Sequence, residues 1–187
     1  NPFFIFLLIL ACLAVSGCSS SKGTYVNTQM NFGMLQTVAV LPFKNLTSDE
    51  QAAERVRDAF TVMLLASEAV YVLPPGEVAR GINRAGISPP SSPTIEQIKT
   101  LGGILEVDAV LTGVLREYET LRSGSSEANV ISLSLQMIET ETGSIIWSAS
   151  STKGGITMVD RLFGGGGESK NEITTEACNE LLDKLFQ

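Results

Sequence analysis

The sequence NVISLSLQMIETETGSIIWSAS occupies residues 129–150 and predicts two neighbouring strands of an antiparallel sheet. Apolar and polar residues alternate through its first half, and this period of two is typical of a strand with one covered and one exposed face. The apolar members are Ile131, Leu133, Leu135 and Met137. Gly143 supplies the positive φ of a tight turn. We therefore expect strands over 129–140 and 144–153, joined at Gly143.

Further strands are expected towards the N-terminus. Residues 107–119 are strand-like and precede the pair just described. Residues 38–41 form a continuous apolar run closed by Pro42, the pattern of a strand buried on both faces. Residues 70–73 predict one more short strand. The sheet is thus expected to combine an antiparallel half with a second, more deeply buried half.

Helices are predicted between these strands and after them. Ser48 and Gln51 have the spacing of a capping box, and so do Thr94 and Gln97. A short helix follows the prolines at 74–75 and closes at Gly86, and the helix that starts at Thr94 is expected to end at the glycines at 102–103. Apolar residues at helical spacing mark a terminal amphipathic helix. These are Ile173, Ala177, Cys178, Leu181, Leu182 and Leu185.

The order of elements predicts the fold class. Strand, helix, strand, two helices, three strands and a helix make an α+β, or mixed α/β, domain. We expect a central mixed sheet with antiparallel C-terminal strands and helices packed on it. One domain over residues 37–187 accounts for this pattern.

The N-terminus has the features of a lipoprotein signal peptide over residues 1–17. An uncharged apolar run over 3–15 has the length of a signal-peptide core and is too short to span a bilayer. Val15, Ser16, Gly17 and Cys18 match a lipobox, so we expect cleavage before Cys18, which then carries a diacylglycerol and an N-acyl chain. A buried helix with an incidental cysteine is the alternative, and the polar run at 19–22 disfavours it. Since the chain starts at Asn1, we expect a few residues before it.

Residues 19–36 predict a flexible tether of 18 residues between the lipidated cysteine and the domain. The segment is rich in Ser, Gly, Asn, Thr and Gln. It is also more apolar than a spacer requires, so that part of it is a candidate for packing on the domain or on a neighbouring subunit. Its apolar residues are Tyr25, Met30, Phe32, Met34 and Leu35.

Charge and cysteine content exclude several classes of protein. With 13 Lys and Arg against 20 Asp and Glu, the formal charge of −7 argues against nucleic acid as a partner. Cys12 leaves with the signal peptide and Cys18 is acylated, so Cys178 has no partner for an intramolecular disulfide. Its place on an apolar helical face predicts a buried cysteine rather than a reactive thiol.

The residue types also argue against an enzyme. The sequence contains no histidine, which excludes Ser-His-Asp and Cys-His catalysis and histidine metal sites. Glu117 and Glu119 share one strand face, where acids are expected to be structural. A small hydrolase would need a catalytic set that the sequence lacks. We expect no metal and no cofactor apart from the covalent lipid on Cys18.

The glycine-rich segment over 154–167 invites two further interpretations. Glycines before a helix resemble a phosphate-binding loop, but no glycine directly precedes Lys170 and Asn171 stands where Ser or Thr is needed. The segment also carries clustered apolar residues, which predict contact with lipid or a neighbouring subunit, the alternative being that they fold back over the core. These residues are Ile156, Met158, Val159, Leu162 and Phe163.

Three segments resemble a known family. They are VAVLPFKN at 38–45, LGGILEVDAVLTG at 101–113 and ETGSIIWS at 141–148. They are similar to motifs of the CsgG-like superfamily of envelope lipoproteins, which shares its fold with the N-terminal domain of TolB. That superfamily includes the curli secretion lipoprotein, PelC of exopolysaccharide export and the LpoB activator of peptidoglycan synthase.

The resemblance implies a non-enzymatic lipoprotein of the outer membrane that faces the periplasm. Ser19 rather than Asp after the lipidated cysteine fits sorting to the outer membrane. We expect a homo-oligomeric component of a system that secretes or assembles an envelope or extracellular polymer, with envelope or secretion proteins as partners. The alternative is a monomeric regulator that activates a peptidoglycan synthase, for which a tether of 18 residues is short.

Overall fold

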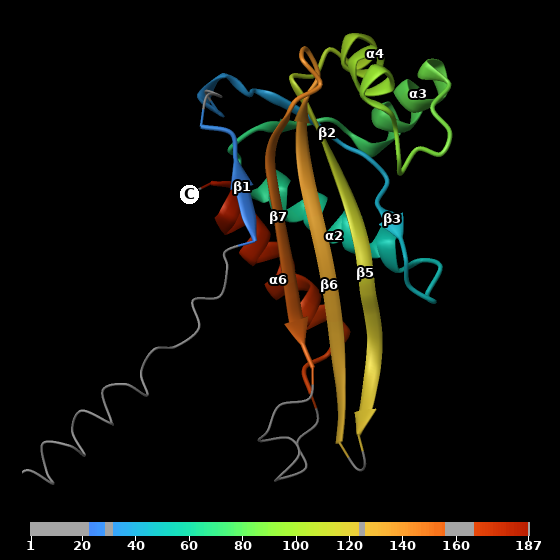
Figure 1. Ribbon diagram of the computed structural model, residues 1–187, viewed down its shortest axis with the longest axis vertical. Coiled ribbons are helices and arrows are strands. Elements are labelled where there is room, and N and C mark those ends of the chain that lie inside the picture. Colours follow the sequence, from blue (N-terminus) through green and yellow to red (C-terminus); the bar gives the residue numbers. More distant parts are fainter. Residues whose placement is uncertain (1–22, 29–31, 124–125, 156–166, 187) are drawn as a thin grey trace, which may run out of the picture.

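The computed structural model describes residues 23–28, 32–123, 126–155 and 167–186, which form a mixed sheet with helices against both of its faces (Figure 1). The strands are β1 Thr24–Val26, β2 Thr37–Val40, β3 Lys44–Asn45, β4 Tyr71–Val72, β5 Ala109–Ser123, β6 Ser126–Glu139 and β7 Ile145–Gly154. The helices are α2 Ala52–Ala66, α3 Pro75–Ala85, α4 Ile95–Leu105 and α6 Lys170–Leu185, with a short 3-10 turn η1 at Phe32–Met34. No helix of these described ranges is long and apolar enough to cross a bilayer.

The sheet combines a parallel and an antiparallel half. Its strand order is β1-β7-β6-β5-β2-β4, and β3 pairs with β5 beyond the end of β2. β2 runs parallel to both β4 and β5, whereas β5, β6, β7 and β1 are antiparallel to their neighbours. Gly143 has a φ of 77° in the turn before β7, as its place in the sequence predicted. The α+β fold with antiparallel C-terminal strands is therefore confirmed.

Two layers of helices pack on opposite faces of the sheet. Helices α2 and α6 cover one face along most of its length, and α3 and α4 cover the other face at one end (Figure 1). Along β2, Val38 and Val40 belong to the first core, whereas Ala39 and Leu41 belong to the second. This division confirms that residues 38–41 are buried on both faces.

The three segments that resemble the CsgG-like family supply contacts of the core. A Cβ on Gly113 would lie 2.6 Å from the ring of Phe43, so only glycine lets β5 pass this closely beneath the phenyl group. Trp147 is fully buried, and its Nε1 donates a hydrogen bond of 3.0 Å to the carbonyl of Lys184. These residues hold strands and helices together, which explains why the segments predict the fold better than the function.

Two predicted helix ends are wrong. Ser48 and Gln51 do not form a capping box, because α2 starts at Ala52 and its N-cap Gln51 makes no side-chain cap. The neighbouring carboxylate of Asp49 accepts a hydrogen bond from Gln51 N instead, at 3.2 Å. The glycines at 102–103 do not end α4, which continues to Leu105 and closes at Glu106 in the left-handed region. Position 102 requires glycine within the helix, because a Cβ there would collide with the side chain of Thr140.

Other predicted boundaries are confirmed. Thr94 and Gln97 form the expected capping box at the start of α4. Helix α3 begins with Pro75 and ends at Gly86, whose φ of 64° places it in the left-handed region. Ser169 caps α6 through a box with Glu172, which the sequence pattern did not single out.

The predicted tether is partly ordered. β1 pairs with β7 in antiparallel register, Val26 lying opposite Trp147, and Leu35 is buried in the core beneath η1. Apolar residues of this segment gain more from packing on the sheet edge than from solvation as a spacer. The sheet thus begins before Thr37, and only residues 19–23 separate Cys18 from β1.

Strands β5 and β6 are longer than the sequence pattern indicated. They pair from Ala109 opposite Glu139 to Ser123 opposite Ser126, through residues that lie between the two predicted strands. In Figure 1 their lower ends extend beyond α2 and α6. Cross-strand pairing continues through this outer part, where Ala128 and Val130 of β6 are still buried.

Candidate functional site

One large face of the sheet is left without a helix and is the candidate binding surface. Since α3 and α4 cover this face only near one end, the rest of β5, β6, β7 and β1 is open, and we call it the open face (Figure 1). Its side chains alternate with those of the α2 and α6 core. They are Tyr25, Thr112, Val114, Ser132, Ser134, Gln136, Ser148, Ser150 and Thr152.

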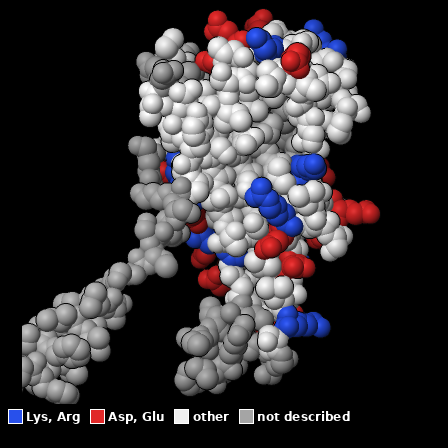
Figure 2. All heavy atoms as spheres, viewed as in Figure 1, with Lys and Arg blue, Asp and Glu red and all other residues white. Residues whose placement is uncertain are grey.

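The open face is mainly uncharged and rich in hydroxyl groups. Figure 2 shows this side of the molecule, with a broad uncharged area between its top and its middle. Thr152 Oγ1 donates to Ser132 Oγ at 3.2 Å across β7 and β6, and the guanidinium of Arg116 donates to Ser134 Oγ. Charged side chains begin at Arg116 and Glu117, towards the lower end.

A shallow hollow of about 600 Å³ lies at the upper end of the open face. It is lined by Tyr25, Gln136 and Ser148 from the strands, by Ile95 of α4, and by the turn before β7. Tyr25 is 52% exposed and Ile95 is 53% exposed. An aromatic and an aliphatic side chain beside an amide and a hydroxyl can bind a partner by apolar contact and directional hydrogen bonds together.

The chemistry of the open face is that of binding. Among the described residues, no group of three or more His, Cys, Asp or Glu side chains is placed to hold a metal ion. The hydroxyl groups on this flat sheet can donate and accept hydrogen bonds to a partner.

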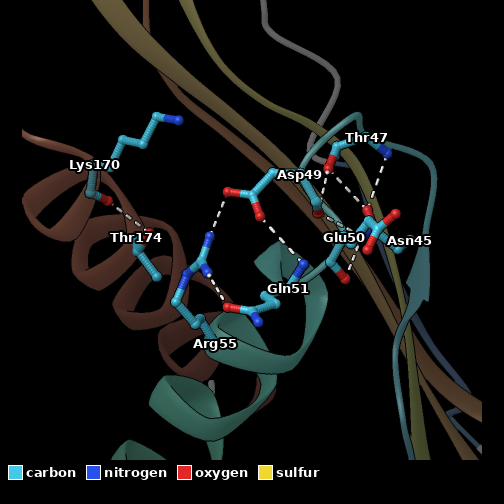
Figure 3. Close-up of polar contacts among 8 residues, drawn as sticks. All are labelled: Asn45, Thr47, Asp49, Glu50, Gln51, Arg55, Lys170 and Thr174. Atoms are coloured by element: carbon cyan, nitrogen blue, oxygen red, sulfur yellow. Dashed lines mark hydrogen bonds and ion pairs between the residues drawn. The ribbon is translucent and has the colours of Figure 1, made fainter.

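A second polar cluster, between β3 and α2, has a structural role (Figure 3). Asn45 Nδ2 donates to the carbonyls of Asp49 and Glu50 at 2.8 and 3.2 Å, and its Oδ1 accepts from Thr47. Arg55 pairs with the Asp49 carboxylate and donates to Gln51 Oε1 at 3.4 Å. These hydrogen bonds give partners to backbone groups of the turn that leads into α2.

Lys170, in the segment that the sequence already distinguished from a phosphate-binding loop, lies against an aromatic ring. Its ammonium lies 4.9 Å from the centre of the Tyr118 ring, and the Arg55 guanidinium lies 5.9 Å from the same ring. Tyr118 is buried between α2 and α6. Both cations are therefore engaged in cation–π contacts that join the helices to the sheet.

A third cluster joins α6 to β7. Glu180 pairs with the ammonium of Lys153 at 2.8 Å and with that of Lys184 at 2.5 Å, and it accepts from Ser151 Oγ at 2.8 Å. Burial by itself would raise the pKa of Glu180, but these hydrogen bonds outweigh it and lower the pKa to about 2. The hydrogen bond that Lys153 donates to Glu180 correspondingly raises the pKa of Lys153 above its ordinary value.

Most of the residues predicted to carry function belong to segments that the structure does not describe. Cys18 and the lipobox residues 15–17 lie outside the described residues, and so does the apolar cluster Ile156, Met158, Val159, Leu162 and Phe163. Glu117 and Glu119 are exposed on β5. Cys178 is fully buried, as predicted, and burial raises the pKa of its thiol to about 12.

The sequence predicted only part of the open face. The alternation through residues 131–137 predicted one exposed face of β6. It could not show that α3 and α4 leave this face free over three adjacent strands, because helix placement depends on contacts distant in sequence.

Comparison with known proteins relates the chain to envelope lipoproteins. A family described as "Peptidoglycan-synthase activator LpoB" matches residues 18–152. No curated protein sequence gives a match. The CsgG-like family expected from the sequence is not the one that these comparisons single out.

Solved structures with the same fold come from other bacteria. The PelC dodecamer of Paraburkholderia phytofirmans aligns with a TM-score of 0.55 and 14% identity, covering 87% of this chain and 94% of that one. Lipoprotein GNA1162 of Neisseria meningitidis aligns with a TM-score of 0.56 and 20% identity, covering 79% and 99%. At these identities the likeness establishes the fold alone.

Proposed function

Because this chain belongs to the family of the peptidoglycan-synthase activator LpoB, we propose that it is a non-enzymatic envelope lipoprotein that binds and activates a peptidoglycan synthase. The observation that carries the proposal is the open face, a mainly uncharged sheet surface over three long strands that α3 and α4 cover only near one end. Such a surface offers shape and hydrogen bonds to a folded protein domain. It supports a binding role in an activator.

The anchor in this proposal is the lipid on Cys18. The family match begins at this residue, which supports a mature protein that starts there. Ser19 at the next position favours the outer membrane, with the domain in the periplasm. Mass spectrometry of the protein extracted from membranes should find a diacylglyceryl and an N-acyl group on Cys18, and Cys18→Ser should release the protein from the membrane fraction.

Reconstituted synthesis tests the activator role. Each purified peptidoglycan synthase of the same cell is assayed on its lipid-linked precursor with and without the mature chain, residues 18–187. We expect one synthase to be stimulated, and Gln136→Glu with Ser150→Glu, both at exposed positions, to reduce the stimulation at least about tenfold by placing charge on the open face. Ser48→Glu, an exposed serine in the loop before α2, is the matched control. No stimulation of any synthase would exclude this role.

An oligomeric component of a secretion or assembly system is the second candidate. The specific support is the shared fold with PelC, which is described as a dodecamer. Sedimentation of the mature chain distinguishes the two proposals, because a ring of many subunits sediments far faster than a monomer. A monomer that stimulates a synthase supports the activator, and a large closed ring without stimulation supports the assembly component.

A further inference from the structure

An exposed apolar surface surrounds the place where the chain enters the sheet. Val26 of β1, Phe32 of η1, and Leu185 and Phe186 at the end of α6 line one groove, and Met34 follows Phe32 by two residues in η1. We call these five residues the tether-side patch. Val26, Met34 and Phe186 are 45%, 70% and 47% exposed. Phe32 and Leu185 are partly buried against the core beneath.

The tether-side patch is hollowed rather than flat. Val26, Phe32, Leu185 and Phe186 line a groove of about 810 Å³ together with Thr24 and the polar end of α6. A smaller hollow of about 190 Å³ adjoins it and shares Phe32, Leu185 and Phe186. The apolar surface therefore continues from the edge of β1 across the end of α6.

The distance to Cys18 determines what can lie against this patch. Thr24 follows Cys18 by six residues and is held in the sheet opposite Ala149. Six fully extended residues span at most about 20 Å. If Cys18 is lipidated, as the proposed function requires, the tether-side patch cannot move farther than this from the lipid surface.

We propose that the tether-side patch rests on the bilayer surface in which Cys18 is anchored. Apolar side chains beside the lipid anchor add a second membrane contact, since binding to a bilayer surface strengthens with the apolar area that is buried in it. Val26 points to the covered side of the sheet and Tyr25 to the open face. The contact therefore leaves the open face available to a partner close to the membrane.

Liposome binding of the mature chain with Cys18→Ser tests the patch without the lipid anchor. Vesicles of phosphatidylethanolamine and phosphatidylglycerol are used, and the partition coefficient is measured by flotation. The triple variant Val26→Ser, Met34→Ser and Phe186→Ser should bind at least about fivefold more weakly, because binding scales with the apolar area buried. The control Val62→Ser with Leu46→Ser, exposed by 64% and 55% elsewhere, should bind as the parent.

A fluorescence probe locates the contact directly. Phe186→Trp should be quenched by lipids brominated along their acyl chains, and Leu46→Trp, at an exposed site away from the patch, should not. Equal quenching of both, or unchanged binding of the triple variant, overturns the proposal. A parent chain that dimerises in solution, becomes monomeric in the triple variant and ignores vesicles would assign the patch to a second copy and also overturn it.

These outcomes are separate from those of the proposed function. The vesicle measurements contain no synthase, so failure of the patch leaves the activation assay unaffected. If the open-face variants no longer stimulate the synthase but bind vesicles normally, the result concerns only the activator role.

Discussion

Asp108 and Thr37 hold the two central parallel strands in register. Asp108 Oδ2 accepts hydrogen bonds from Thr37 N and Thr37 Oγ1, each 2.9 Å long, and another of 2.9 Å from Gln36 N. In return Asp108 N donates to Thr37 O and Thr37 Oγ1, each at 3.1 Å. The start of β2 is thus fixed at the start of β5. This contact accounts for the acidic residue within the segment that resembles the CsgG-like family.

Replacing Asp108 tests this contact. Burial favours a higher pKa for Asp108, but the hydrogen bonds from Gln36 and Thr37 outweigh it and hold the pKa below its ordinary value. Asp108→Ala leaves two backbone amides without an acceptor, and the expected loss is about 2 kcal/mol in the free energy of unfolding by urea. Asp108→Asn retains one acceptor oxygen and should lose less. Glu141→Ala, in the exposed turn before β7, should change stability little; an equal loss there would contradict the assignment.

Two adjacent glycines of α4 are predicted to respond in opposite directions to alanine. A Cβ on Gly102 would lie 2.3 Å from Thr140 Cβ, so Gly102→Ala must push α4 away from β6. We expect a loss of about 2 kcal/mol in thermal or urea unfolding. A Cβ on Gly103 meets nothing within 4 Å, so Gly103→Ala should stabilise the helix by about 0.5 to 1 kcal/mol. Similar effects of the two changes would contradict the close packing of α4.

The Glu180 cluster predicts acid sensitivity. Its pKa is about 2 in the folded protein, below the ordinary value of 4.5, so the carboxylate stabilises the fold fully above pH 4.5. That contribution is lost as the pH falls from 4.5 towards 2. We expect Glu180→Gln to lower the free energy of unfolding by only about 1 kcal/mol at pH 7, because the side chain is partly exposed to solvent. Near pH 2 the change in the free energy of unfolding should be small.

Urea titrations at several pH values check this prediction. Glu176→Gln, an exposed glutamate of the same helix, is the control and should leave the pH profile unchanged. A Glu180→Gln profile that keeps the full decline of the parent between pH 4.5 and 2 would show that another group causes it.

Cys178 should be protected until the protein unfolds. In residues 18–187 with Cys18→Ser it is the sole thiol, because Cys12 precedes this range. Burial raises its pKa to about 12, which leaves little thiolate at pH 8. Reaction with a disulfide reagent should be at least roughly a hundredfold slower than in urea-unfolded protein. Rapid reaction under native conditions would mean that α6 opens from β7.

Several elements could be predicted because their residues determine them locally. The alternation through Ile131 and Leu135 specifies a strand, Thr94 with Gln97 specifies a helix start, and Gly143 specifies a turn. Cys178 was placed correctly in the core because the apolar spacing of α6 is helical. Ser48 failed as a cap because the Asp49 carboxylate, paired with Arg55, bonds Gln51 N instead.

The sequence by itself determined the mixed sheet, the helices and the expectation of a lipid on Cys18, since periodicity, caps and a lipobox act over a few residues. The tertiary structure decided where surfaces remain uncovered. Helices α3 and α4 stop short of Ser134 and Ser150, and β1 turns a stretch of tether into the edge of the sheet. The position of α3 and α4 and the pairing of β1 with β7 depend on apolar contacts between residues far apart in the sequence. Such contacts cannot be derived from the local sequence pattern.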